Sequence, residues 1–137
     1  MRLNQITIGV TDLLAGIDFY TALGLRLIVH TNDYYARFEM PGGEGSTFSL
    51  HTVDTVTPST TLFYFETDNI EAVTERAIAA GATLDSPAQD QSWLWREARL
   101  TDPFGNPFCL YTAGENRRFP PWRKDAAANP EKQAKKP

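Results

Sequence analysis

The chain contains the same pattern twice, and this internal duplication restricts its fold more than any other feature. Each copy begins with a segment of alternating apolar and polar residues, 5–10 in the first copy and 62–67 in the second, an offset of 57. A helix-like stretch follows and ends at Gly24 or Gly81, with the same offset. Two copies are too few for a solenoid, which needs at least three repeats to bury a continuous core. The copies must therefore close on each other or on a partner chain, and we expect a cavity between them.

Each copy is predicted to fold in the order β-α-β-β-β, which belongs to the α+β class. The alternation of Ile6 and Ile8 is typical of a half-buried strand, and Asp12 supplies an N-cap for the first helix. Asp68 and Glu71 have the spacing of a capping box at the second helix. The predicted strands are residues 5–10, 25–31, 34–40, 47–53, 62–67, 82–85, 93–101 and 107–112.

The chain length indicates one domain built from two halves. We assign residues 1–53 to module one, 54–60 to a linker and 61–114 to module two, so that 1–114 forms a single domain. Segment 115–123 combines Phe119 and Trp122 with a rigid Pro pair. We expect this segment to dock on the domain, because exposing both aromatic side chains forfeits about 1.5–3 kcal/mol each. Residues 124–137 have the composition of a flexible, solvated tail.

Composition and charge exclude several classes of protein. Apolar residues make up 42% of the chain, enough for a packed core, but no apolar run approaches the roughly 20 residues that cross a bilayer. No secretory signal is visible and the single cysteine suits a reducing compartment, so we expect a cytoplasmic protein without a membrane partner. The net charge is −4, and residues 1–114 alone carry −8. This acidic body disfavours nucleic acid as a partner and favours a cationic ligand.

The alternation also separates two faces of the predicted sheet. One face is apolar and must carry the helices; its members are Ile6, Ile8, Val10, Ala36, Phe38, Phe48, Leu50, Phe63, Phe65, Ala98, Leu100, Phe108 and Leu110. The opposite face, called here the second face, mixes aromatic and polar side chains: Gln5, Thr7, Tyr35, Arg37, Glu39, Ser49, His51, Leu62, Tyr64, Glu66, Trp93, Trp95, Glu97, Arg99, Cys109 and Tyr111. A solvent-exposed sheet rarely gathers so many aromatic residues. The second face therefore either lines a pocket for a mainly apolar ligand or is covered by another chain.

We predict that the second face forms the ligand site. The expected ligand-binding residues are Gln5, Thr7, Tyr35, Arg37, His51, Tyr64, Glu66, Trp93, Trp95, Glu97 and Tyr111. The tryptophan and tyrosine rings would stack on the ligand. Glu39, Glu66 and Glu97 would attract a cationic group, and Gln5 and His51 would supply hydrogen bonds.

Catalysis by side chains of the same face is an open alternative. Cys109 would act as a nucleophile if His51 lay beside it as a base, although a single cysteine is more often structural. Glu66 or His51 would serve as a general acid or base. We expect Glu66 instead to pair with Arg37 or Arg99.

Short motifs follow one another at matching positions over most of the chain, from Leu3 to Thr112. They are Val10–Leu13, Ile17–Tyr20 and Leu23–Leu25 in the first copy, and Thr67–Ala72, Gly81–Ala82 and Asp102–Pro107 in the second. In this order and spacing they resemble the vicinal oxygen chelate superfamily of glyoxalases, extradiol dioxygenases, and fosfomycin- and bleomycin-resistance proteins. The resemblance implies a curved, mixed eight-stranded sheet of two pseudo-symmetric modules, with helices on the convex face, an open concave cavity and a homodimer.

The resemblance also bears on metal binding. In metal-dependent members of the superfamily it places the ligands at Gln5, Ser49, Leu62 and Cys109. Leu62 has no donor atom and Ser49 is a poor ligand, so the expected His/Glu set is missing. A non-standard site of Gln5, His51 and Cys109, with or without Glu66, is the remaining metal candidate. We predict no cofactor, with a divalent metal as the alternative.

These observations favour a metal-independent, homodimeric binding protein of the bleomycin-resistance type, which sequesters a small organic molecule or antibiotic. Segment 115–123 would close the pocket or brace the dimer. One alternative is a glyoxalase-like lyase or dioxygenase with an atypical metal site. Another is a non-catalytic interaction module, which would bury the aromatic face under a partner chain.

Overall fold

The two predicted modules are present and follow one another along the chain. The structure is a computed structural model that describes residues 1–42 and 45–124. Module one contains β1 (Gln5–Val10), α1 (Leu13–Ala22), β2 (Arg26–Thr31), β3 (Tyr35–Glu39) and β4 (Thr47–Thr52). Module two contains β5 (Phe63–Glu66), α2 (Ile70–Ala79), β6 (Thr83–Asp90), β7 (Arg96–Thr101) and β8 (Pro107–Thr112), and the 3-10 helix η1 (Gly114–Arg117) follows. The predicted α+β class and the order of elements in both modules are confirmed.

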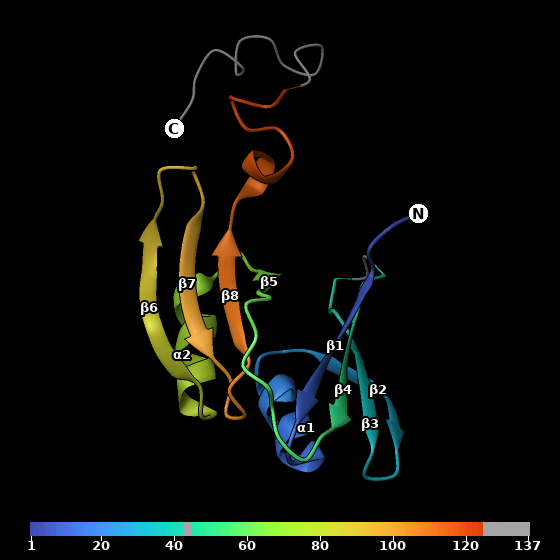
Figure 1. Cartoon of the computed structure of the whole chain (residues 1–137). Coiled ribbons are helices and arrows are strands. Elements are labelled where there is room, and N and C mark those ends of the chain that lie inside the picture. Colours follow the sequence, from blue (N-terminus) through green and yellow to red (C-terminus); the bar gives the residue numbers. More distant parts are fainter. Residues whose placement is uncertain (43–44, 125–137) are drawn as a thin grey trace.

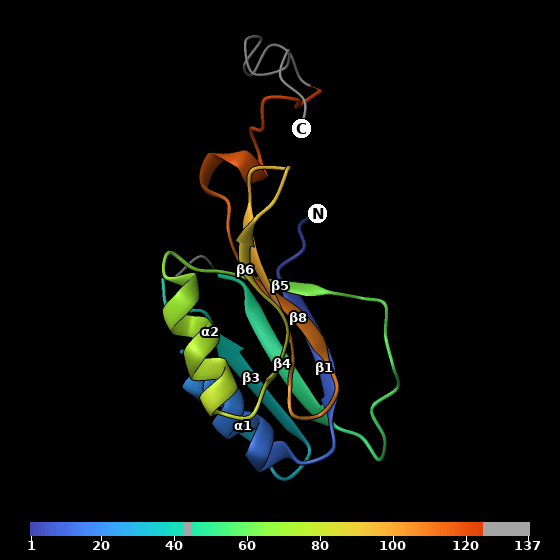
Figure 2. The same ribbon diagram turned by 90° about the vertical axis from the view of Figure 1, so that its left-hand side faces the viewer.

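The eight strands divide into two four-stranded mixed sheets, one in each module (Figure 1). The order is β1-β4-β3-β2 in module one and β5-β8-β7-β6 in module two, so β1 and β5 are corresponding edge strands. β1 pairs parallel with β4, β5 pairs parallel with β8, and the other neighbours are antiparallel. Figure 2 shows α1 and α2 on one side of the sheets and the linker between β4 and β5 on the other.

The strand register brings corresponding residues of the two modules to equivalent positions. In module one, Ser49 of β4 lies opposite Arg37 of β3. In module two, Cys109 of β8 lies opposite Arg99 of β7. Arg37 and Arg99 are therefore equivalent residues of the duplicated module.

The apolar faces predicted from the alternation meet in one core that both modules share. The central residues of this core are no more than 1% exposed: Ala36, Phe38, Phe48, Leu50, Ala98, Leu100, Phe108 and Leu110. Aromatic rings join the modules, since the ring of Phe48 lies 4.8 Å from Tyr20 and 5.3 Å from Phe63, measured between centroids. Each buried ring contributes about 1.5–3 kcal/mol to stability. The contact between modules is therefore part of the core and not a loose interface.

Helix α1 lies close against β4 because of its cap and one small residue. The Asp12 carboxylate accepts a hydrogen bond from the backbone N–H of Ala15 at 3.0 Å, which confirms Asp12 as the predicted N-cap. Gly16 faces the sheet, and a Cβ at this position would lie only 2.9 Å from a terminal methyl of Leu50. The missing side chain at Gly16 thus allows the close approach of the helix.

A buried polar cluster fastens module one to the turn between β7 and β8. The hydroxyl of Tyr20 donates to Asp102 Oδ2 at 2.6 Å, and the side-chain amide of Asn106 donates to the carbonyl of Gly9 at 2.9 Å. Asp102 also accepts the backbone N–H groups of Phe104 and Asn106, both at 2.9 Å. Asp102 is 3% exposed, and such a buried carboxylate is tolerated only when its oxygens are hydrogen-bonded.

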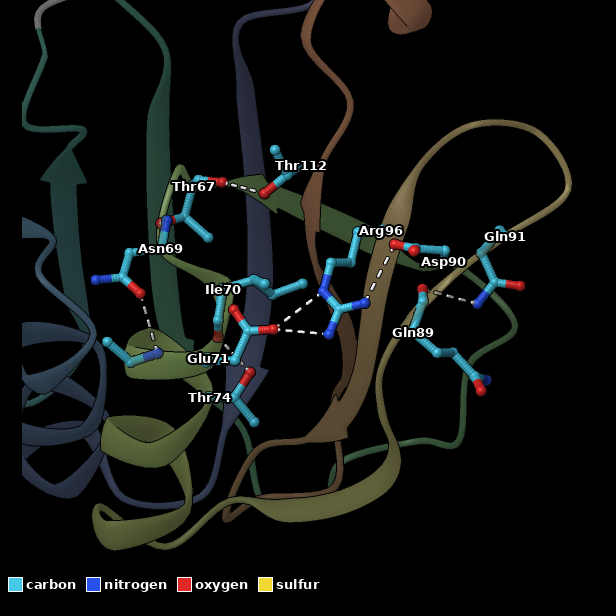
Figure 3. A network of polar contacts seen from close by, with 11 residues as sticks. Thr67, Asn69, Ile70, Glu71, Thr74, Gln89, Asp90, Gln91, Arg96 and Thr112 are labelled. Carbon is cyan, nitrogen blue, oxygen red and sulfur yellow. Dashed lines mark hydrogen bonds and ion pairs between the residues drawn. The ribbon is translucent and has the colours of Figure 1, made fainter.

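The N-cap of α2 is one residue later than the sequence predicted. Asn69, and not Asp68, accepts the backbone N–H of Ala72, at 3.4 Å. Glu71 therefore does not complete a capping box. Its carboxylate instead accepts two hydrogen bonds from Arg96 of β7, at 2.8 and 3.0 Å, so that α2 is tied to its sheet (Figure 3). These hydrogen bonds lower the pKa of Glu71.

Strand β6 is longer than predicted and β7 is shorter. The predicted strands cover 82–85 and 93–101, whereas the structure has β6 at Thr83–Asp90 and β7 at Arg96–Thr101. β6 is an edge strand, and its pairing with β7 shifts register on both sides of Ser86, so Pro87 needs no ladder partner. β7 begins only at Arg96, which places Trp93 in the preceding turn.

The segment after β8 is attached at its start. The indole N–H of Trp95 donates to the backbone carbonyl of Asn116 in η1 at 3.2 Å. Phe119 and Trp122 are half-buried, and the ring of Phe119 contacts the nearby guanidinium of Arg118 at 5.4 Å. The predicted flexible tail lies outside the described residues from 125 onward. Among the described helices, none has the length and apolar character needed to cross a membrane.

Candidate functional site

Three aromatic side chains lie together on the second face of module two. Trp95 stacks on Tyr111 of β8, with ring centroids 4.7 Å apart. Tyr64 of β5 meets both rings edge-on, 6.1 Å from Trp95 and 5.6 Å from Tyr111. We call these three residues the aromatic wall. Tyr111 is 6% exposed whereas Tyr64 is 43% exposed and Trp95 is half-buried, so Tyr64 and Trp95 supply the accessible ring surface.

A nearly buried carboxylate lies beside the wall. Glu97 of β7 is opposite Tyr111 in the ladder and is only 4% exposed. Its Oε1 accepts the indole N–H of Trp93 at 3.1 Å, and its Oε2 accepts Nη2 of Arg99 at 3.3 Å. These two donors compensate the burial of a charge that would otherwise be costly. Trp93 therefore stays at the site although it belongs to the turn.

Cys109 lies under this face as a buried, protonated thiol. Burial and, to a lesser extent, the charge of Glu97 raise its pKa, Arg99 opposes them, and the pKa goes from 9.0 to about 12. The thiol donates a weak hydrogen bond to the carbonyl of Leu110. A thiol in this state is a poor nucleophile at neutral pH. Cys109 belongs to β8 and His51 to β4, in different sheets, and the thiol bonds within its own strand.

A groove of about 1100 Å³ adjoins the aromatic wall between β1 and β5. Four predicted ligand-binding residues line it: Gln5, Tyr64, Glu66 and Tyr111. The core residue Phe63 and Arg117 of η1 also line the groove. Burial raises the pKa of Tyr111, Glu66 adds to this effect, and Arg117 opposes it. We call this space the inter-module groove.

The second face of module one is held by its own hydrogen bonds. The Tyr35 hydroxyl lies 2.7 Å from Ser49 Oγ, and Arg37 Nε donates to the Tyr35 hydroxyl at 2.9 Å. Burial raises the pKa of Tyr35, but the hydrogen bonds with Ser49 and Arg37 outweigh it and lower the pKa overall. Gln5 accepts a hydrogen bond from Thr47 at 2.8 Å.

Two further predicted residues, Thr7 and His51, line a separate cavity of about 360 Å³. It lies between β1 and the linker, which Figure 2 shows as an arch beside β1 and β8. The linker contributes hydroxyl groups to the cavity lining, including those of Thr55 and Ser59.

The predicted ligand-binding residues thus fall into three places. Tyr64, Trp95, Tyr111, Glu97 and Trp93 form one cluster, and Gln5 and Glu66 join it through the inter-module groove. Thr7 and His51 line the linker cavity, and Tyr35 and Arg37 form a pair on module one. The expectation that Glu66 pairs with Arg37 or Arg99 is wrong: Arg37 donates to the Tyr35 hydroxyl and the ion pair of Arg99 is with Glu97.

Arg99 is a candidate that the sequence prediction left out of the ligand-binding set. It lies on the second face, in contact with the buried carboxylate, and its side chain is 43% exposed. The duplication could have identified Arg99 as the equivalent of Arg37, because each arginine comes shortly before the last strand of its module, which begins at Thr47 or Pro107. The pairing with Glu97 depends on three-dimensional contacts and could not be predicted.

The residues at the implied metal positions do not fit a metal ion. Leu62 offers no donor atom, and Ser49 is fully buried and bonded to Tyr35. Cys109 is a buried thiol whose raised pKa disfavours the thiolate that binds metals. Among the described residues, no three or more His, Cys, Asp or Glu side chains come close enough to hold an ion.

Comparison with known proteins gives a family and a set of similar folds. The family model described as Glyoxalase/Bleomycin resistance protein/Dioxygenase superfamily matches residues 2–110. No curated protein matches the chain.

Several crystal structures are similar to the whole two-module unit. One is a glyoxalase/bleomycin resistance protein/dioxygenase family enzyme from Burkholderia phytofirmans PsJN, with a TM-score of 0.71 and 21% identity over 82% of this chain and 99% of that one. Another is a glyoxalase-related enzyme from Fulvimarina pelagi, with a TM-score of 0.70 and 22% identity over 82% and 88% of the two chains. TioX from Micromonospora sp. ML1 has a TM-score of 0.64 and 18% identity over 82% and 99%. At these identities the similarity establishes the fold alone.

Proposed function

Because the chain belongs to the glyoxalase/bleomycin resistance protein/dioxygenase superfamily, we propose that it binds and sequesters a small organic molecule without a metal ion. The ligand lies against the aromatic wall, beside the mouth of the inter-module groove. The observation that carries this proposal is the wall itself. Its rings contact one another at 4.7–6.1 Å on the face that the helices leave uncovered, and Tyr64 is 43% exposed.

A planar ligand is the natural occupant of such a surface. Ring-on-ring contacts contribute about 0.5–1.5 kcal/mol beyond the burial of area. Trp95 is held in place by its stacking on Tyr111 and by the hydrogen bond to Asn116, so little rotamer freedom is lost when a ligand binds. The groove of about 1100 Å³ is slightly larger than ordinary ligand sites, which span about 300–1000 Å³.

The metal-free part of the proposal is supported by the donor set. Leu62, the buried Ser49 and the protonated Cys109 stand where ligands would be required. A stable site needs three or four well-placed N, O or S donors. We also propose that the chain forms a homodimer and acts in the cytoplasm, which analytical ultracentrifugation and cell fractionation would test.

Two tyrosine variants test where the ligand binds. 2-Naphthamide, an uncharged planar probe, is titrated calorimetrically into the wild type and into Tyr64→Ala and Tyr34→Ala. Tyr34 is the matched control, because it is an exposed tyrosine, 64% accessible, in the hairpin of module one. We expect Tyr64→Ala to weaken binding about tenfold, on the scale of aromatic anchors, and Tyr34→Ala to leave it unchanged. Equal affinities for all three proteins, or no binding up to about 1 mM, would overturn the proposal.

A further inference from the structure

We propose that Arg99 makes the aromatic site selective for planar aromatic anions, such as aromatic carboxylates, over aromatic cations. This inference rests on the proposed binding function and names the chemical class of its ligand. It reverses the expectation that the acidic composition of the chain attracts a cationic group.

Two of the three carboxylates expected to attract a cation, Glu39 and Glu97, accept donors of the chain itself. Both oxygens of Glu97 accept hydrogen bonds, one from Trp93 and one from Arg99. Glu97 is also 4% exposed, so a ligand has little access to it. Glu39 of β3 forms an ion pair with Arg26 of β2 at 3.4 Å, in the sheet of module one. On the Arg99 side of the aromatic wall a ligand therefore meets a carboxylate, Glu97, whose charge is already compensated. Glu66, which has no ion pair among the described residues, lines the inter-module groove on the β5 side, opposite Tyr111.

The guanidinium of Arg99, in contrast, retains most of its donors. An arginine carries five N–H groups, and Arg99 uses one of them, on Nη2, toward Glu97. Its side chain is 43% exposed, so the terminal nitrogens can be reached from solvent. Nε is buried and finds no hydrogen-bond acceptor among the described residues.

The duplication supplies an internal comparison for this unused donor. Tyr35 lies opposite His51, and Glu97 lies at the equivalent position opposite Tyr111. In module one the Tyr35 hydroxyl accepts Nε of the equivalent arginine at 2.9 Å. In module two the shorter glutamate engages Trp93 with one oxygen and only Nη2 with the other.

The sulfur of Cys109 does not replace the hydrogen bond that Nε of Arg99 lacks. Cys109 stands where Ser49 stands in module one, and a protonated thiol is a weak acceptor. Arg99 is thus held by one 3.3 Å hydrogen bond to Glu97 and by a weak interaction with the Cys109 thiol, and a carboxylate is a stronger acceptor than this thiol.

The position of Arg99 relative to the wall fits a ring that bears an acidic group. Arg99, Cys109 and Tyr64 lie in one row across β7, β8 and β5. Neighbouring strands are about 4.8 Å apart, so Arg99 and Tyr64 are separated by about 10 Å of backbone. A ring placed against Tyr64 would direct a carboxylate along this row toward the exposed part of Arg99. Carboxylate and guanidinium then form charge-assisted hydrogen bonds, which are stronger than neutral ones.

Three probes of equal shape and different charge test the inference. 2-Naphthoate, 2-naphthamide and 2-naphthamidine are titrated calorimetrically into the wild type, Arg99→Gln, Arg99→Lys and Arg37→Gln. We expect the wild type to bind the naphthoate about tenfold more tightly than the amide, and the amidine most weakly. In Arg99→Gln the naphthoate should fall to the affinity of the amide, and the affinity of the amide itself should not change. Arg99→Lys should retain part of the preference, and Arg37→Gln, the equivalent change in module one, should retain all of it.

The possible outcomes separate this inference from the proposed function. Tightest binding of the amidine, or an anion preference that survives in Arg99→Gln, would overturn the role of Arg99 while leaving an aromatic ligand in place. Loss of the preference in Arg37→Gln alone would transfer the anion site to module one and would also overturn it. If none of the probes bound in a manner sensitive to Tyr64→Ala, the proposed function itself would fail. Thermal unfolding midpoints of the variants show whether each one is folded.

Discussion

Removing the hydroxyl of Tyr20 should weaken the attachment between the modules without disturbing the core. The hydroxyl donates to Asp102 at 2.6 Å, and the two residues are 0% and 3% exposed. A hydrogen bond to a charged acceptor contributes about 1.5–3 kcal/mol. Tyr20→Phe keeps the ring contacts with Phe19 and Phe48, each at 4.8 Å between centroids, so no cavity term adds to this loss. We therefore expect a loss of about 1.5–3 kcal/mol in the free energy of unfolding.

Urea denaturation measures this loss directly. With a slope of about 1–3 kcal/mol per molar urea, the midpoint should fall by about 1 M with an unchanged slope. Tyr34→Phe is the control, since Tyr34 is exposed and its hydroxyl has no hydrogen bond with a described residue. A Tyr20→Phe midpoint indistinguishable from that of the control would refute the hydrogen bond as a link between modules. Two separate unfolding transitions in the wild type would refute the shared core.

Two other changes have effects of predictable direction. Trp95→Ala should weaken binding of 2-naphthamide by about 1–3 kcal/mol. It should also lower the free energy of unfolding, because the stacking on Tyr111 and the hydrogen bond to Asn116 are lost. An unaltered midpoint of urea denaturation would contradict this second effect. Cys109 should make stability depend on pH above 9, because its pKa is about 12 in the folded chain and 9.0 ordinarily. The unfolded chain releases the thiol proton first, so this contribution is complete below pH 9 and is lost as the pH rises toward 12. Cys109→Ala should remove that part of the slope in urea titrations between pH 8 and 11, and parallel curves for the two proteins would show that the thiol does not titrate abnormally.

The alternation of side chains was sufficient to predict the core. Phe38 and Leu50 on module one, and their counterparts Leu100 and Leu110, are buried as expected. Their strands have a strict period of two and one face packed against helices, so the pattern fixes the register.

Features that depend on the position of a strand within its sheet were not predictable. β6 was predicted to end at residue 85 but continues through Pro87 to Asp90, because it is at the edge of its sheet, where a proline costs no ladder bond. The N-cap of α2 falls on Asn69 and not on Asp68, because two adjacent residues of similar chemistry competed for one position. Sequence patterns locate such features only to within a residue or two.

The candidate site was predicted in composition but not in arrangement. Alternation placed Tyr64, Trp95 and Tyr111 on one face, and they do form the aromatic wall. It could not show that Glu97 binds Arg99, because the partner of a charged side chain depends on rotamers and neighbouring strands. Nor could it show that the two modules form separate sheets, which places Tyr35 and Arg37 apart from the wall.

The most direct test of metal-free ligand binding is one calorimetric titration performed twice. 2-Naphthamide is titrated into protein dialysed against a chelator, and again after one equivalent of Zn²⁺ has been added, with the metal content of both samples measured. The account predicts the same affinity in both titrations and no stoichiometric metal that survives dialysis. Binding that appears only after zinc is added, or one equivalent of metal retained through the chelator, would contradict it.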